Sequence, residues 1–116
     1  MADNYEAIIF DLDDTLFDCS GMLVQAARRR AARALVECGL PMEVDEAIEL
    51  QEDLAKHHGP CFLVFDEIGR RYDLGKEALD AAYQAYNADE VMDIEPFPDA
   101  ISTLRELREQ GRRCLL

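Results

Sequence analysis

The sequence has few basic residues, and this shortage argues against two common classes of partner. Lysine and arginine together number 12, against 25 aspartates and glutamates, so the formal net charge is −13. Nucleic acids and anionic membrane surfaces both attract basic proteins, and we therefore expect no nucleic-acid or membrane partner. Long apolar runs are also missing. No segment approaches the roughly 18 apolar residues that a transmembrane helix needs.

Targeting and disulfide signals are equally scarce. The first residues show no basic stretch followed by an apolar one, so we expect no signal peptide. The four cysteines are widely spaced and form no C-x-x-C pair, which is typical of free thiols in a cytoplasmic protein. If the substrate is anionic, a divalent cation is the natural means of offsetting the negative field of the protein.

The most informative feature is an apolar run that ends abruptly in carboxylates. Residues 8–10 are Ile-Ile-Phe, and residues 11–15 are Asp-Leu-Asp-Asp-Thr. A short apolar run of this kind predicts a buried strand. Unpaired carboxylates are too costly to bury, so those at the carboxyl end of the strand are expected to face a crevice. Carboxylates in that position commonly hold a cation or take part in chemistry.

Apolar spacing predicts one strand, five helices and the start of a second strand. In one helix Phe62, Phe65 and Ile68 are expected to face inward, and in the next Leu79, Ala82, Tyr83 and Tyr86 share one side, with Tyr83 and Tyr86 expected in the core. The last helix carries Ile101, Leu104 and Leu107 at helical spacing. The expected elements are a strand at 5–10, helices at about 21–38 (capped by Ser20), 43–57 and 60–72, one after the turn at 73–75, one from Pro98 to Gly111, and a strand beginning near residue 113.

Two prolines in the segment 95–99 mark a boundary between substructures. Because parallel strands are joined by a crossover, the four helices before this boundary are an insert of about 75 residues in that crossover. We therefore predict an α/β fold with an incomplete parallel sheet. The expected divisions are residues 1–17 (first strand and loop), 18–94 (helical domain) and 95–116 (return helix and second strand).

Residues 10–16, Phe-Asp-Leu-Asp-Asp-Thr-Leu, resemble the first motif of the haloacid dehalogenase-like (HAD) hydrolases. The helical insert is placed as in members with a C1-type cap. Residues 96–100 and 104–111 are similar to the segment that returns from cap to core. The resemblance implies a Rossmann-like core, only partly present in this chain, with an inserted α-helical C1-type cap.

The resemblance also implies roles for three residues. Asp11 would be the nucleophile that forms an aspartyl phosphate, and Asp13 would protonate the leaving group and later activate water. Mg²⁺ would be held by the Asp11 carboxylate and the Asp13 main-chain carbonyl, both hard oxygen ligands. Thr15, the substrate-binding candidate, would orient the loop through its hydroxyl. The implied activity is Mg²⁺-dependent hydrolysis of a small phosphorylated metabolite.

Asp13 favours phosphate esters over haloacids, because the dehalogenating members lack this second aspartate. The family pattern also needs a phosphate-binding Ser or Thr, a core lysine and further acidic metal ligands. The only lysines, Lys56 and Lys76, fall in the predicted cap. We therefore expect the 116 residues to be an N-terminal portion that is inactive alone and completed either by the rest of a core or by a homodimer partner.

Several alternative interpretations stay open. They are a non-catalytic helical interaction module or dead HAD-like protein, and a dehalogenase or phosphotransferase of the same fold. A solvated turn could also explain the acidic residues, with Asp14 and Asp18 carrying no chemistry. An EF-hand beginning at Asp11 is excluded, because Leu16 and Met22 stand where Gly and Glu are required. The basic stripe of residues 28–33 is interpreted as a solvated helix face.

Overall fold

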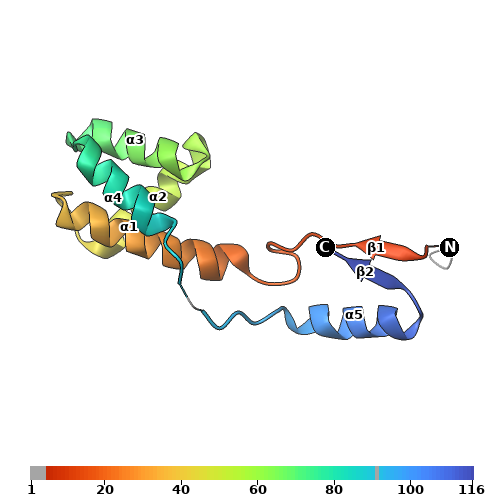
Figure 1. Cartoon of the computed structure of the whole chain (residues 1–116). Coiled ribbons are helices and arrows are strands. Elements are labelled where there is room, and N and C mark those ends of the chain that lie inside the picture. The colour runs from red at the N-terminus through yellow and green to blue at the C-terminus, as the bar shows by residue number, and fades with distance from the viewer. Residues whose placement is uncertain (1–4, 91) are drawn as a thin grey trace. The chain divides into compact units, whose positions relative to one another are not determined.

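The computed structural model of the protein describes residues 5–90 and 92–116. The elements in chain order are β1 (Ala7–Ile9), the π-helix η2 (Ser20–Val24), α1 (Gln25–Glu37), α2 (Val44–His58), α3 (Cys61–Tyr72), α4 (Lys76–Tyr86), α5 (Pro98–Glu109) and β2 (Arg113–Leu115) (Figure 1). They form two compact units. Residues 25–90 are the helical unit, and the described residues before and after them are the strand unit. None of the described helices combines the length and apolar character needed to cross a membrane.

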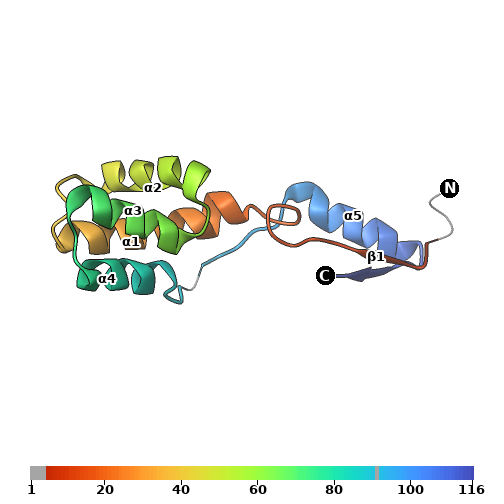
Figure 2. The ribbon, with the colours of Figure 1, turned by 90° about the horizontal axis from the view of Figure 1, so that it is seen from above.

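The helical unit is built around α1. This helix contacts both α2 and α4, and α3 contacts α2 and α4 in turn (Figure 2). Ala27 and Ala31 lie one helical turn apart on α1, and both are buried with Ala32. Alanine at these positions leaves room for neighbouring helices to approach closely. The helical unit therefore has a close-packed interior with small residues on its central helix.

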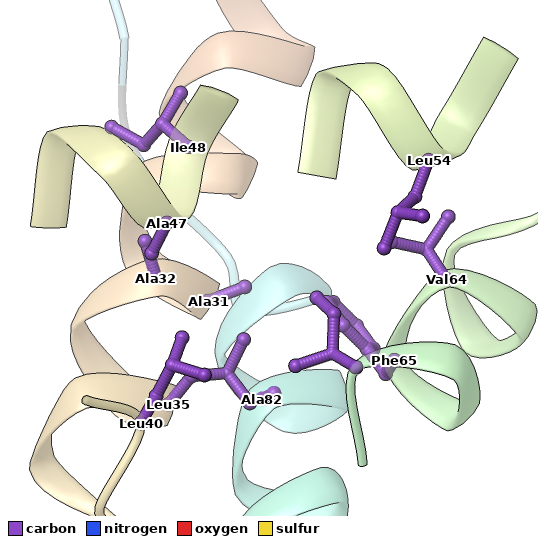
Figure 3. Packing of buried hydrophobic residues seen from close by; sticks show 11 residues of the cluster. Ala31, Ala32, Leu35, Leu40, Ala47, Ile48, Leu54, Val64, Phe65 and Ala82 are labelled. Atoms are coloured by element: carbon purple, nitrogen blue, oxygen red, sulfur yellow. The ribbon is translucent and has the colours of Figure 1, made fainter. Parts of the chain in front are cut away.

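Larger side chains from α1, α2 and α3 complete this core, together with Ala82 from α4 (Figure 3). Phe65 and Ile68 on α3 are 2% and 0% exposed, as the sequence predicts. Fully burying a side chain of this size contributes about 1.5–3 kcal/mol to folding. The members of the core cluster are Ala31, Ala32, Leu35, Leu40, Ala47, Ile48, Leu54, Val64, Phe65, Ile68 and Ala82.

Two aromatic residues that the helical spacing placed inward are exposed instead. Phe62 is 50% exposed and Tyr83 is 48% exposed, so the prediction for these two side chains is wrong. Both lie at the edge of the faces that α3 and α4 share, where none of the described elements covers them. Helical periodicity identifies the face on which a residue lies, but not whether a neighbour extends far enough to cover it.

One polar side chain is part of the helical core. Gln51 on α2 is 2% exposed, and its Nε2 donates hydrogen bonds to the carbonyl oxygens of Arg28, at 2.9 Å, and Ala47, at 3.2 Å. Because its amide nitrogen has partners, Gln51 avoids the cost of an unsatisfied buried donor. The bond to Arg28 also joins α2 to α1.

Arg30 on α1 is not part of a solvated stripe, which corrects the interpretation of that basic run. Its side chain is 24% exposed and binds the chain that leaves α4. The partners are the carbonyl oxygens of Ala85 (2.8 Å), Tyr86 (3.0 Å) and Ala88 (3.2 Å) and the carboxylate of Glu90. A planar guanidinium is suited to this role because it has several donors in fixed directions. The arginine thus satisfies carbonyls at the carboxyl end of α4.

In the strand unit, β1 and β2 form a two-stranded parallel sheet. The register pairs Ala7 with Arg113, Ile8 with Cys114 and Ile9 with Leu115. Helix α5 leads into β2 and packs beside it, as both ribbon views show (Figures 1 and 2). The predicted second strand and the α/β fold class are therefore confirmed.

The strand unit is much less buried than the sequence predicts. Ile9, expected in a buried strand, is 75% exposed, and Ile101 on α5 is 40% exposed. Ala100 is instead the buried residue of α5. Two three-residue strands and one helix have too little surface to cover both faces of a sheet.

Candidate active site

The acidic loop begins at the carboxyl end of β1. The Phe10 N–H donates a hydrogen bond to the Leu115 carbonyl at 2.7 Å, which extends the parallel pairing by one residue. Asp11 follows directly. Because the two strands are parallel, their carboxyl ends lie at the same edge of the sheet. In open α/β sheets, ligands bind outside this edge.

A tight turn shapes the first part of the loop. The Leu12 carbonyl accepts hydrogen bonds from the N–H groups of Thr15 (3.3 Å) and Leu16 (3.0 Å). Asp14 occupies the left-handed backbone region, with a φ of 60°, which aspartate tolerates better than most residues. The Thr15 Oγ1 donates to the Asp11 Oδ2 at 3.4 Å, a long hydrogen bond. Thr15 therefore lies beside the carboxylate of Asp11.

Asp14 organises the loop and is not merely solvated. Its Oδ1 accepts from the Ser20 N–H at 2.8 Å, and its Oδ2 accepts from the Ser20 Oγ at 2.6 Å. These hydrogen bonds lower the pKa of the Asp14 carboxyl, and the bond from the Ser20 hydroxyl has the larger effect. The predicted capping role of Ser20 is thus reversed. Ser20 is a donor, and the carboxylates of Asp14 and Asp18 (to the Gly21 N–H, 2.8 Å) supply the acceptors.

Sequence reasoning could have found one of these acceptors but not the other. Asp18 precedes Gly21 by three residues, which is the spacing of a helix N-cap. Asp14 lies six residues before Ser20, and no local capping pattern covers that separation. Its contact depends on the left-handed backbone at Asp14 itself.

The far end of the loop is attached to the return segment after the insert. Phe17 is buried, with 7% of its surface exposed, and forms an isolated bridge with Pro96. The Phe97 N–H donates to the Leu16 carbonyl at 2.8 Å. The boundary that the prolines predict is therefore a point of attachment within the strand unit. It holds the loop at the end that carries Leu16 and Phe17.

Cys19 is a poor candidate for a nucleophile. Burial raises the pKa of its thiol, and the carboxylates of Asp13, Asp14 and Asp18 raise it further by disfavouring a thiolate beside them. A cysteine acts as a nucleophile in its thiolate form. The loop carboxylates are therefore better candidates for a nucleophile than this thiol.

The loop offers oxygen ligands suited to magnesium, but only part of a set. Asp11 and Asp13 are both exposed, and carboxylate and carbonyl oxygens are the donors that Mg²⁺ prefers. Within residues 5–90 and 92–116, no three or more His, Cys, Asp or Glu side chains gather closely enough to hold a metal ion. The donor chemistry fits Mg²⁺, and further ligands would have to come from elsewhere.

A parallel strand pair with an acidic loop at its carboxyl edge is an arrangement of the α/β class. Residues 5–116 match the family model of the haloacid dehalogenase-like hydrolases, described as a hydrolase. The chain belongs to this family. The resemblance indicated by residues 10–16 is therefore confirmed.

Curated relatives of the chain are named for a more specific activity of their own. The chain is 38% identical over 111 residues to a glyceraldehyde 3-phosphate phosphatase of Methanopyrus kandleri, covering 91% of this chain and 47% of the relative. It is 32% identical over 110 residues to the protein of that name in Methanocaldococcus jannaschii, with 91% and 47% covered. For the Pyrococcus furiosus protein of that name the identity is 34% over 109 residues, with 91% and 45% covered. The chain thus spans about half the length of the curated relatives it matches.

Proposed function

We propose that this chain carries the nucleophile-bearing part of a Mg²⁺-dependent phosphatase for a small phosphorylated metabolite. The observation that carries the proposal is the acidic loop at the carboxyl end of β1, in a chain that belongs to a hydrolase family. The relatives' activity makes glyceraldehyde 3-phosphate the first substrate to test. The free cysteines favour a cytoplasmic location.

In the proposed reaction, Asp11 attacks the phosphorus of the substrate. A bond forms between its carboxylate oxygen and phosphorus while the bond from phosphorus to the leaving oxygen breaks, and Asp13 gives that oxygen a proton. Water then attacks the aspartyl phosphate and loses a proton to Asp13. Inorganic phosphate is released and both carboxyl groups return to their starting states. The two roles fall to different residues because one carboxyl group must act as nucleophile while the other gives and takes the proton.

The surrounding loop supports these roles through contacts already described. Thr15 donates to the Asp11 carboxylate, and Asp14 closes the loop onto Ser20, so the backbone that carries both candidate catalytic carboxylates is held from two sides. A bound Mg²⁺, held by the Asp11 carboxylate and the Asp13 carbonyl, would offset the repulsion between an anionic nucleophile and an anionic phosphate.

We further propose that residues 18–94 are a cap that limits access to the site. The compactness of residues 25–90, with their own core, supports a separately folded insert. Lys56 and Lys76 both lie in the helical unit, and Lys56 already pairs with Asp53 at 3.5 Å. A core lysine, a phosphate-binding hydroxyl and the remaining metal ligands would come from additional chain or from a second copy.

A chimera tests the proposal. This chain would replace the matched segment of the Methanopyrus kandleri relative, and hydrolysis of glyceraldehyde 3-phosphate would be measured with and without Mg²⁺. The proposal expects Mg²⁺-dependent phosphate release that Asp11→Asn abolishes and that Asp93→Asn, at an exposed position in the segment after α4, leaves unchanged. A folded chimera whose activity survives Asp11→Asn would overturn it.

A further inference from the structure

A second candidate site lies entirely within the helical unit. A hollow of about 320 Å³ opens between α3 and α4. None of its lining residues belongs to the acidic loop. Pockets of this size hold small organic molecules when apolar walls are combined with a few polar groups. Four apolar or aromatic residues and two aspartates line it: Phe62, Phe65, Leu79, Tyr83, Asp66 and Asp80.

The sequence of α3 explains where the hollow forms. Phe65 and Asp66 come three and four residues after Phe62, and Gly69 comes four and three residues after them, which puts all four along one face of the helix. At Gly69 the neighbouring helix comes so close that a Cβ atom would lie 2.8 Å from the Leu79 Cδ1. This tight contact marks one end of the hollow. Toward Phe62 the same face is open to solvent, with Phe62 itself half exposed.

The exposed aromatic residues are the first indication of a ligand. Phe62 and Tyr83 are 50% and 48% exposed on the two helices that form the hollow. Phe65, which also lines the hollow, is only 2% exposed. Large apolar side chains gathered at one exposed place commonly mark binding sites. Aromatic rings also attract cations through the negative charge of their faces.

The charge around the hollow indicates the kind of ligand. Asp66 comes from α3 and Asp80 from α4, and among the described residues neither forms an ion pair or a side-chain hydrogen bond. The adjacent Glu67, by contrast, is paired with Arg70 and Arg71. The hollow therefore combines an aromatic lining with two uncompensated negative charges, one from each helix.

We propose that this hollow binds a small organic ammonium ion with an apolar stem, of the arylalkylamine class. The stem would lie against the aromatic and leucine side chains, and the ammonium group would face the two carboxylates. Carboxylates and aromatic rings both favour a cation, and the apolar wall favours a ligand with a hydrophobic body. The inference does not depend on the proposed phosphatase activity.

A charge series with a constant ring tests the ligand class. Phenethylammonium, the neutral 2-phenylethanol and the anionic 3-phenylpropanoate would be titrated separately into the full 116-residue chain, followed by ¹H–¹⁵N NMR. We expect phenethylammonium to shift the signals of residues 62–66 and 79–83 and to bind at least about tenfold more tightly than the alcohol. Added salt should weaken binding of the amine and leave the alcohol unaffected.

Variants test the residues. Asp66→Asn with Asp80→Asn should weaken amine binding about tenfold, and Tyr83→Leu should weaken it while keeping an apolar wall. Glu49→Gln, an equal loss of charge at an exposed position on α2, is the control and should change nothing. Circular dichroism checks that each variant is folded. The proposal would be overturned by equal affinity for the amine and the alcohol, or by a double variant that binds the amine as well as the original chain does. It would also be overturned by signal shifts that depend on protein concentration alone, because these indicate a second copy in the hollow.

Discussion

The two units of this protein differ most in how completely they bury their apolar residues. In the helical unit, Phe65 and Ile68 are 2% and 0% exposed at the centre of an interior made by four helices. In the strand unit, Phe17 and Ala100 are buried, with 7% of each residue exposed, whereas Ile9 is 75% exposed. Yet the strand unit carries Asp11 and the acidic loop. Stability and candidate chemistry are therefore concentrated in different parts of the chain.

The difference follows from the elements themselves. Helices complete their backbone hydrogen bonds internally, so four of them with apolar faces can enclose a core by local contacts. A strand needs neighbours on both sides and cover on both faces, and two short strands supply neither. A substitution should therefore have opposite consequences in the two units, with activity lost in one and stability lost in the other.

The largest expected effect is a loss of activity caused by a substitution in the strand unit. In the chimera with the Methanopyrus kandleri relative, Asp11→Asn should lower phosphate release by roughly a thousandfold or more, about 4 kcal/mol in transition-state free energy. Because the Asp11 side chain is exposed, thermal unfolding should shift little. Steady-state assays and a melting curve on the same sample measure both. Parallel loss of activity and stability would contradict the separation of roles.

The helical core should show the converse. Phe65→Ala should lower the free energy of unfolding by about 3–5 kcal/mol, because it removes a fully buried ring between α3 and its neighbours. Ile9→Ala in the strand unit is the matched control and should cost under about 1 kcal/mol, since Ile9 is mostly exposed. Urea unfolding followed by circular dichroism compares the two. Equal costs would mean that the strand unit is as well packed as the helical one.

A smaller loss is expected where α1 holds the end of α4. Arg30→Lys should destabilise the helical unit by about 1–2 kcal/mol, because a lysine cannot reproduce hydrogen bonds to several carbonyls at once. Arg29→Lys next to it should cost less than about 0.5 kcal/mol. Arg29 is half exposed and its pair with Asp45 is 3.5 Å long. Indistinguishable unfolding midpoints for the two variants would argue against a stabilising role of the Arg30 hydrogen bonds at the end of α4.

The smallest expected effect is on the pH dependence of stability, and it comes from Glu67 on α3. Hydrogen bonds from Arg70 and Arg71 lower the pKa of Glu67 from 4.5 to about 2. Since the folded pKa is below the unfolded one, the stabilisation is fully present above pH 4.5 and is lost as the pH falls toward 2. Glu67→Gln should therefore melt slightly below the original protein at pH 7, and the two melting temperatures should converge near pH 2. A gap that persists at low pH would indicate a packing effect instead.

The acidic loop could be predicted from the sequence because its signal is local. An apolar strand followed at once by carboxylates identifies both the element and the edge at which Asp11 lies. The two strands and five helices likewise follow from periodicity, proline and glycine, with bounds that differ by a few residues from those expected. These features depend on neighbours in the sequence, so a single chain suffices to find them.

The features that the sequence did not indicate depend on distant contacts. Arg30 binds carbonyls more than fifty residues away, and nothing in a run of arginines distinguishes it from its neighbours. The exposure of Phe62 and Tyr83 depends on how far the opposing helix extends. The role of Asp14 requires a left-handed backbone, which an aspartate permits without demanding.

The most direct test of the account is the location of a trapped phosphoryl group. The chimera would be mixed with ³²P-labelled substrate in Mg²⁺, quenched in acid and reduced with borohydride, which converts an aspartyl phosphate to homoserine. The account predicts a homoserine at position 11, found by peptide mass spectrometry, and none in the Asp11→Asn variant. Turnover of the substrate with the modification at a different residue, or with Asp11 dispensable, would contradict it.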